Sequence, residues 1–138
     1  MKVYAFDVDE TLEISNGPVS LQSMMELRVE GHIVGICGNW GGFVRSVKGW
    51  QHVVSFVNCA PPLFVEQMNK GLGLVRMDKA WFLQELQKYI PADEYVMVGN
   101  VYGAKNSLGF TCGSQDSEAA QIAGWRFIKE DDFAKGVR

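Results

Sequence analysis

Short apolar runs alternate along the chain with longer segments in which apolar residues recur at helical spacing. The apolar runs predict five buried strands, which we place at residues 3–6, 32–36, 53–57, 95–98 and 125–128. The intervening segments predict helices at residues 21–28, 43–47, 63–70, 78–90 and 116–123. Strands that alternate with helices are joined by crossovers, so the pattern predicts an α/β protein: a three-layer, Rossmann-like fold whose parallel five-stranded sheet carries helices on both faces.

Turn and capping residues mark the ends of several helices. Gly31 and Gly124 are expected to end the helices before them, since glycine readily adopts the left-handed backbone of a helix C-terminus. Asp78 is expected to cap the helix at 78–90, whose apolar side would carry Phe82, Leu86, Tyr89 and Ile90. Residues 99–114 are rich in glycine and polar side chains, which predicts a long loop.

The composition narrows the class of protein. With 138 residues, 47% of them hydrophobic and 21% charged, the chain fits a single globular domain over residues 1–138. The formal net charge of −3 does not indicate a nucleic-acid binder but allows a small anionic substrate. The cysteines lack C-x-x-C spacing and suggest neither a disulfide framework nor a structural zinc site, which fits a reducing compartment. No apolar run is long enough for a signal peptide or a membrane span, so we expect a cytoplasmic protein without a membrane-embedded part; an oligomer is compatible with these features.

Polar residues follow the predicted strands at the edge where parallel sheets bind their ligands. Asp7 and Asp9 come directly after the first strand, in a segment that we take to be extended. Their carboxylates would then lie on the same side and converge on one cation, with Glu10 pointing away and exposed. Oxygen ligands of this kind suit a hard divalent ion such as Mg²⁺. The next strands end at Cys37, Gly38 and Asn39, at Asn58, and at Gly99 and Asn100.

The residues at these strand ends resemble a known family. FDVDETL, at residues 6–12, is similar to the first motif, D-x-D-x-T, of the haloacid dehalogenase (HAD) superfamily of phosphohydrolases, and it follows the first strand directly. The resemblance extends over most of the chain: Cys37 stands where the second motif ends its strand, Lys79 where the third motif's lysine opens a helix, and Asn100 where the acidic fourth motif belongs. Residues 116–128 are similar to the usual ending of the family.

The resemblance implies a Mg²⁺-dependent phosphatase that acts through an aspartyl-phosphate. Asp7 would be the nucleophile that takes up the phosphoryl group, Asp9 the acid and base, and Lys79 the group that orients the nucleophile and the phosphoryl group. The implied Mg²⁺ ligands are Asp7, Asp9 through its backbone carbonyl, Asn100 and Asp116, and the implied substrate contacts are Thr11, Cys37, Gly38 and Asn39. The connecting segments are too short for a cap domain, so we expect an open site and a phosphorylated substrate.

Two features support an anion site without the resemblance. Lys79 is placed in the first turn of a helix, where a cation opposes the helix dipole unless an anion lies nearby. Gly38, Gly41 and Gly42 allow close backbone approach at a helix N-terminus, where free N–H groups favour phosphate.

Two positions depart from the family pattern. Cys37 replaces the Ser or Thr of the second motif; its thiol donates more weakly to phosphate, and the residue can equally be a small buried hydrophobe. Asn100 replaces the expected aspartate, which removes a negative charge and should weaken Mg²⁺ binding. Asp116, the next acid, lies beyond the long loop and can serve either as a metal ligand or as an acid in the first turn of its helix.

These departures define the competing hypotheses. Against the phosphatase stands a catalytically degenerate HAD-like protein that binds metal or a phosphorylated partner; Asn100→Asp should then restore activity. A phospho-receiver domain would need an aspartate at the end of the third strand, where Asn58 stands. We expect substrate specificity to come from the 99–114 loop, and residues 106–113 to border the site or to be poorly ordered.

Overall fold

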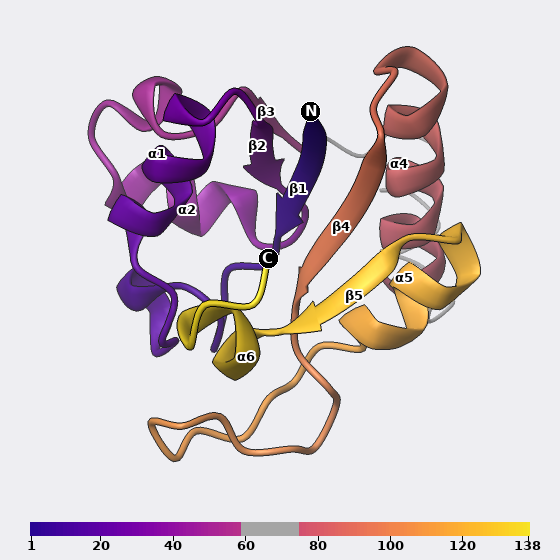
Figure 1. Cartoon of the computed structure of the whole chain (residues 1–138). Coiled ribbons are helices and arrows are strands. Elements are labelled where there is room, and N and C mark those ends of the chain that lie inside the picture. Colours follow the sequence, from indigo (N-terminus) through magenta and orange to yellow (C-terminus); the bar gives the residue numbers. More distant parts are fainter. Residues whose placement is uncertain (59–74) are drawn as a thin grey trace.

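A computed structural model describes residues 1–58 and 75–138 of the chain (Figure 1). Its strands form one sheet in which every pairing is parallel, in the spatial order β3-β2-β1-β4-β5. The strands are β1 Lys2–Phe6, β2 Ile33–Ile36, β3 Phe56–Val57, β4 Glu94–Gly99 and β5 Arg126–Lys129. This arrangement confirms the predicted α/β class with its parallel five-stranded sheet, and it is consistent with a Rossmann-like fold.

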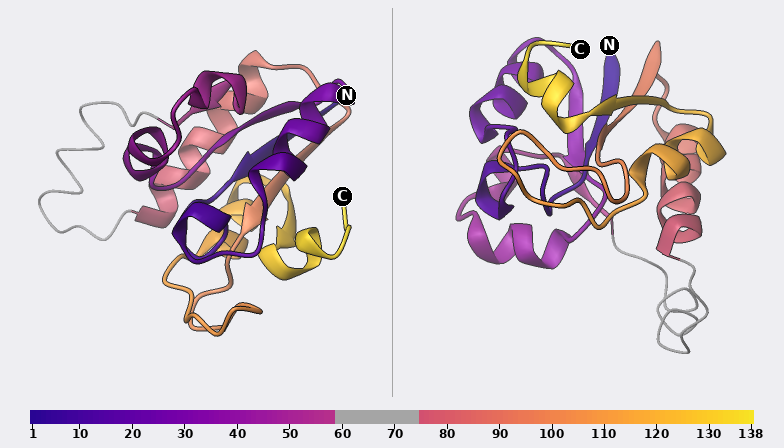
Figure 2. Two further views of the ribbon diagram at one scale, coloured as in Figure 1. Left: turned by 90° about the vertical axis from the view of Figure 1, so that its left-hand side faces the viewer. Right: turned by 90° about the horizontal axis from the view of Figure 1, so that it is seen from below.

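Helices cover both faces of the sheet (Figures 1 and 2). They are α1 Leu21–Val29, α2 Trp40–Ser46, α4 Val75–Tyr89, α5 Asp116–Ala123 and α6 Glu130–Ala134, with short 3-10 turns at Glu13–Ser15 and Trp50–His52. Gly31 and Gly124 follow α1 and α5 with φ angles of 95° and 77°, as expected of glycines that end helices. The expected helix at 63–70 and Cys59 lie outside the described residues.

Alternate residues of β1 build the two halves of the core. Tyr4 and Phe6 point into a cluster that includes Met24 of α1, Phe43 of α2 and Phe133 of α6. Val3 and Ala5 point to the opposite face and pack in a second cluster with Leu83 of α4 and Ala120 of α5. Because side chains of a strand alternate between faces, a strand buried on both sides reads as an unbroken apolar run, and the three predicted layers follow.

The structure corrects two expectations about the elements. β3 is confined to Phe56–Val57, because Val53 and Val54 are buried in the core from a turn rather than paired in the sheet. α4 begins at Val75 instead of at Asp78, since nothing in residues 75–77 breaks a helix. Tyr89 lies on the same side of α4 as Phe82, Leu86 and Ile90, as predicted, although it is 78% exposed.

The carboxyl ends of β1, β2 and β4 lie at one edge of the sheet, because neighbouring strands run in the same direction. The chain between β4 and α5, residues 100–115, forms a loop below this edge (Figure 1) and contacts the loop that follows β1 through Asn106. The strand ends and these two loops therefore place polar residues from distant parts of the sequence in one region. Within the described residues, no helix has the length and apolarity that crossing a bilayer requires.

Candidate active site

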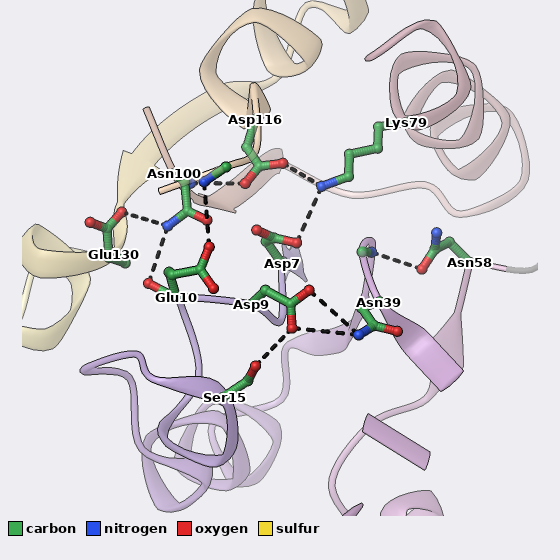
Figure 3. A network of polar contacts seen from close by, with 12 residues as sticks. Asp7, Asp9, Glu10, Ser15, Asn39, Asn58, Lys79, Asn100, Asp116 and Glu130 are labelled. Carbon is green, nitrogen blue, oxygen red and sulfur yellow. Dashed lines mark hydrogen bonds and ion pairs between the residues drawn. The ribbon is translucent and has the colours of Figure 1, made fainter. Parts of the chain in front are cut away.

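A buried ion triad lies at the carboxyl end of β1 (Figure 3). Lys79 reaches from α4 and donates to Asp7 Oδ1 at 3.2 Å and to Asp116 Oδ1 at 2.6 Å. Asp7 is 2% exposed, Lys79 8% and Asp116 0%. Desolvated charges are tolerated in a protein only when they are paired, so each member of the triad depends on the others.

The charges of the triad perturb one another strongly. Burial acts to lower the pKa of Lys79, but the negative charges of Asp7 and Asp116 outweigh it and raise that pKa above its ordinary value. Burial, together with the charge of Asp7, raises the pKa of Asp116 to about 8 against the opposing effect of Lys79. Lys79 is therefore held as a cation between two acids, and buried groups perturbed in this way are typical of functional sites.

Asn100 completes the site from the end of β4. Its backbone N–H donates to Asp116 Oδ2 at 2.9 Å, so both carboxylate oxygens of Asp116 are engaged. The side-chain amide donates to Glu130 Oε2 and to the carbonyl of Glu10, both at 3.2 Å. Asn100 Oδ1 is left without a hydrogen-bond partner although it is buried, and the same is true of Asp7 Oδ2. Figure 3 shows these two oxygens turned toward one another.

Two buried, unpartnered oxygens fit a hard cation. A buried acceptor that lacks a donor is costly, and the cost is removed when the oxygen coordinates a metal ion. Carboxylate and amide oxygens are suitable Mg²⁺ ligands, so Asp7 and Asn100 fit the ion that the sequence predicts. Asp116 instead has both oxygens in hydrogen bonds, which makes it the partner of Lys79 in this arrangement. Among the residues that the structure describes, no three His, Cys, Asp or Glu side chains gather as a metal centre.

Asp9 does not continue the extended line of β1. The backbone turns at Asp9, where the N–H groups of Thr11 and Leu12 both donate to the carbonyl of Val8. The premise of an extended segment is therefore wrong. The carboxylate of Asp9 accepts from Ser15 Oγ at 2.7 Å and lies 3.4 Å from Asn39 Nδ2, so two neutral donors hold it (Figure 3).

Glu10 is only half-buried rather than exposed, and it connects the site to the long loop. It adopts a left-handed backbone with φ of 55°, which lets the chain turn sharply after β1. Its carboxylate accepts a hydrogen bond from the backbone N–H of Gly113, with 3.4 Å between the nitrogen and Oε1. Its carbonyl also accepts from Asn106 Nδ2 at 3.0 Å. Residues of the 106–113 segment thus border the site, which is the first of the two alternatives that the sequence allowed.

The residues after β2 pack closely against Asp7. A Cβ atom on Gly38 would lie 2.2 Å from Asp7 Oδ1, so only glycine allows the approach. The Gly38 N–H donates to Asn58 Oδ1 at 2.8 Å and is not available to a phosphate. The side chain of Asn39 caps α2: its Oδ1 accepts a hydrogen bond from the Gly42 N–H. The Nδ2 of the same side chain contacts Asp9. The hydrogen bond to Asn58 thus conflicts with the predicted contact between the Gly38 N–H and a phosphate.

The two remaining predicted substrate contacts are buried. Cys37 is 0% exposed and belongs to the core cluster of α4 and α5, which agrees with its interpretation as a small hydrophobe. Thr11 is also 0% exposed, and its Oγ1 has no hydrogen-bond partner. Their predicted roles toward a substrate remain predictions.

Sequence reasoning missed Glu130, which is 0% exposed and contacts Asn100. Burial raises the pKa of this carboxyl, and the hydrogen bond from Asn100 partly offsets that effect. The signal was present: Glu130 follows β5 directly, at the same sheet edge as Asp7 and Asn100. The rule that polar residues at strand ends form the site applied to β5 as well.

Comparison with known proteins finds no matching family model and no significantly similar curated protein or solved structure. A buried carboxylate held by a cation, with one oxygen free and an amide oxygen facing it, can act as a nucleophile or hold a divalent metal ion.

Proposed function

We propose that the protein is a Mg²⁺-dependent phosphohydrolase in which Asp7 is the nucleophile. The main support for this proposal is that Asp7 Oδ1 pairs with Lys79, while the buried Asp7 Oδ2 has no hydrogen-bond partner. Lys79 fixes the direction of the carboxylate that is proposed to attack phosphorus. The resemblance of residues 6–12 to the first HAD motif supports the same assignment.

Asp7 and Asn100 would hold the magnesium ion through their free oxygens, with the Asp9 backbone carbonyl as the further ligand that the resemblance implies. When bound, Mg²⁺ neutralises negative charge on the acids and on the phosphoryl group. Asp116 would not be a ligand in this arrangement, because it holds Lys79 and the Asn100 N–H.

The reaction divides into two displacements on phosphorus. In the first, a carboxylate oxygen of Asp7 forms a bond to phosphorus while the bond to the leaving oxygen breaks, and Asp9 gives that oxygen a proton. In the second, Asp9 takes a proton from water, whose oxygen attacks phosphorus and releases inorganic phosphate from Asp7. Ser15 and Asn39 hold the Asp9 carboxylate for both transfers.

The substrate is proposed to be a phosphorylated molecule that reaches the site past Asp9, which is less buried than Asp7. Lys79 would stabilise charge on the phosphoryl oxygens near Asp7, since its ammonium group already lies against that carboxylate. The lack of C-x-x-C spacing among the cysteines fits the cytoplasm as the proposed location.

A second candidate is a HAD-like protein that binds metal or a phosphorylated partner without turnover. It is favoured by Asn100, which supplies a neutral ligand where the family pattern has an acid, and by the Gly38 N–H, which Asn58 occupies. Both features would weaken binding of the metal ion and of the phosphoryl group relative to the family pattern.

The test is hydrolysis of an aryl phosphate with and without Mg²⁺ by the native chain, Asp7→Asn and Asp132→Asn. Asp132→Asn is the matched control, because it makes the same chemical change at an exposed carboxylate on α6. We expect Mg²⁺-dependent turnover that falls at least about 10³-fold in Asp7→Asn and stays at the native level in the control. Circular dichroism checks that all three chains are folded. Native turnover that persists in Asp7→Asn would exclude the mechanism, and Mg²⁺ binding without turnover would favour the second candidate.

A further inference from the structure

The amide of Asn100 is held in one orientation. Its nitrogen lies 3.2 Å from Glu130 Oε2 and 3.2 Å from the carbonyl of Glu10, and both of these atoms are acceptors. The reverse orientation would put Asn100 Oδ1 against two acceptors and leave the amide N–H groups facing Asp7. The surroundings therefore determine which Asn100 atom faces the site.

Glu130 is well placed to impose this orientation. It is the first residue of α6, is 0% exposed, and comes from the far end of the sequence to meet β4. Its second oxygen, Oε1, lies 3.9 Å from Cys112 Sγ, a contact suited to a weak thiol donor. Burying a carboxylate costs free energy unless hydrogen bonds compensate for the lost water, and Asn100 and Cys112 provide such bonds to Glu130.

We propose that Glu130 is a positioning residue that turns Asn100 Oδ1 toward Asp7 and so completes the pair of oxygens for Mg²⁺. The metal part of this proposal rests on the proposed function; the orientation of the amide does not. The arrangement also places a negative charge behind a neutral ligand, so Glu130 contributes charge to the region without being a ligand itself.

This role of Glu130 predicts that Asn100→Asp destabilises the site, whereas the sequence-based hypothesis of a degenerate protein predicts that it restores activity. An aspartate at this position would direct an acceptor at Glu130 Oε2 and at the carbonyl of Glu10, where the native amide donates to both. Replacing Glu130 by Gln as well would restore one donor and one acceptor to the pair. The structure thus predicts that position 100 tolerates an acid only when position 130 supplies a donor.

A double-mutant cycle in metal-free buffer tests the pairing. Urea unfolding is measured for the native chain, Asn100→Asp, Glu130→Gln and the double variant, with EDTA present. We expect Asn100→Asp to raise the unfolding equilibrium constant about tenfold or more, and the double variant to recover most of this loss. Equal stability of Asn100→Asp and the native chain, or additive effects of the two changes, would overturn the proposal.

The effect on the site is tested by the Mg²⁺ dissociation constant, measured by calorimetry for the native chain, Glu130→Gln and Glu130→Met. Gln keeps an acceptor for the Asn100 amide, whereas Met has similar size and no comparable acceptor. We expect Met to weaken Mg²⁺ binding about 10- to 100-fold and Gln to weaken it less than tenfold. Equal losses in the two variants would show that Glu130 does not act through the amide.

The two tests separate this proposal from the proposed function. If the native chain binds no Mg²⁺, the proposed function fails, and the cycle in EDTA still decides whether Glu130 orients Asn100. If Mg²⁺ binds and the cycle shows no coupling, the positioning role fails while the metal site stands.

Discussion

At the scale of single residues, the site depends on how closely β2 approaches Asp7. Gly38 occupies the position where any side chain would meet Asp7 Oδ1. A comparable contact exists at Gly99, where a Cβ atom would lie 2.4 Å from Asp116 Oδ2. Glycines at two strand ends thus make room for the two acids that hold Lys79, which links the backbone of the sheet directly to the ion triad.

Gly38→Ala should therefore disturb the triad. The added methyl group has to displace the buried carboxylate of Asp7, so we expect a loss of about 1–3 kcal/mol in the free energy of unfolding and a strong reduction of the proposed phosphatase activity. Gly41→Ala is the matched control, since its Cβ would meet only the flexible end of Arg45 within helix α2. The control should be neutral or slightly stabilising in urea unfolding. Equal stabilities of the two variants would contradict the expectation.

The sequence predicts some residues of the site better than others. Asp7, Lys79 and Asn100 were found because each follows a strong apolar run or fits a motif, and the structure brings them together. The direction of Asp9 was not found, because the turn at Asp9 depends on hydrogen bonds to Val8 rather than on the local pattern. Glu130 was missed because the rule that strand ends form the site was not applied to β5, which ends directly before it.

At the scale of elements, the side chain of Asn106 makes four of the hydrogen bonds that hold the loop over residues 100–115. Asn106 is 5% exposed and uses its full amide: Nδ2 donates to the carbonyls of Glu10 and Asn16 at 3.0 and 2.8 Å. Its Oδ1 accepts from the N–H groups of Leu108 and Phe110, both at 3.1 Å. A long loop is costly to order, and these bonds offset part of that cost.

Asn106→Ala should free this loop from the one after β1. We expect the free energy of unfolding to fall by about 1–3 kcal/mol, because the Glu10 and Asn16 carbonyls each lose a donor and the N–H groups of Leu108 and Phe110 lose their acceptor. Backbone amides in the loop should also exchange their hydrogens faster. Leu108→Ala is the control: its side chain is 55% exposed, and its backbone bond to Asn106 is retained, so a change within about 0.5 kcal/mol is expected. Unchanged exchange in Asn106→Ala would show that other contacts hold the loop.

The sequence predicts a strand correctly where its apolar residues are both buried in the core and hydrogen-bonded in the sheet. β1, β4 and α5 match their apolar patterns closely, and α5 spans the predicted residues Asp116–Ala123. The run at 53–57 was assigned to one strand because periodicity reports burial and not hydrogen bonding, and only its end pairs with β2. Helix α6 was missed because its first turn is entirely acidic and only Phe133 carries its apolar contact.

At the scale of the whole molecule, the two edges of the sheet have different roles. The carboxyl edge carries buried polar groups with unsatisfied oxygens, which cost stability and suit chemistry. The amino edge carries ion pairs between strand starts: Glu94 of β4 contacts Lys2 of β1 at 3.1 Å and Arg126 of β5 at 3.0 Å. Glu94 thereby joins three neighbouring strands at the edge opposite the candidate site.

This ion-pair group makes part of the stability depend on pH. Hydrogen bonds from Lys2 and Arg126 lower the pKa of Glu94 below its usual value, so its contribution is present above about pH 4.5 and is lost as the pH falls through the folded-state pKa. Glu94→Gln should lower the free energy of unfolding by about 0.5–1 kcal/mol at pH 7, and the difference from the native chain should shrink toward pH 3. Urea unfolding at both pH values checks this, with Glu85→Gln as the control because Glu85 pairs with Lys88 within helix α4 and joins no strands. A difference that stays constant between pH 7 and pH 3 would mean that the variant acts by changing packing, and that charge at the amino edge does not hold the three strands together.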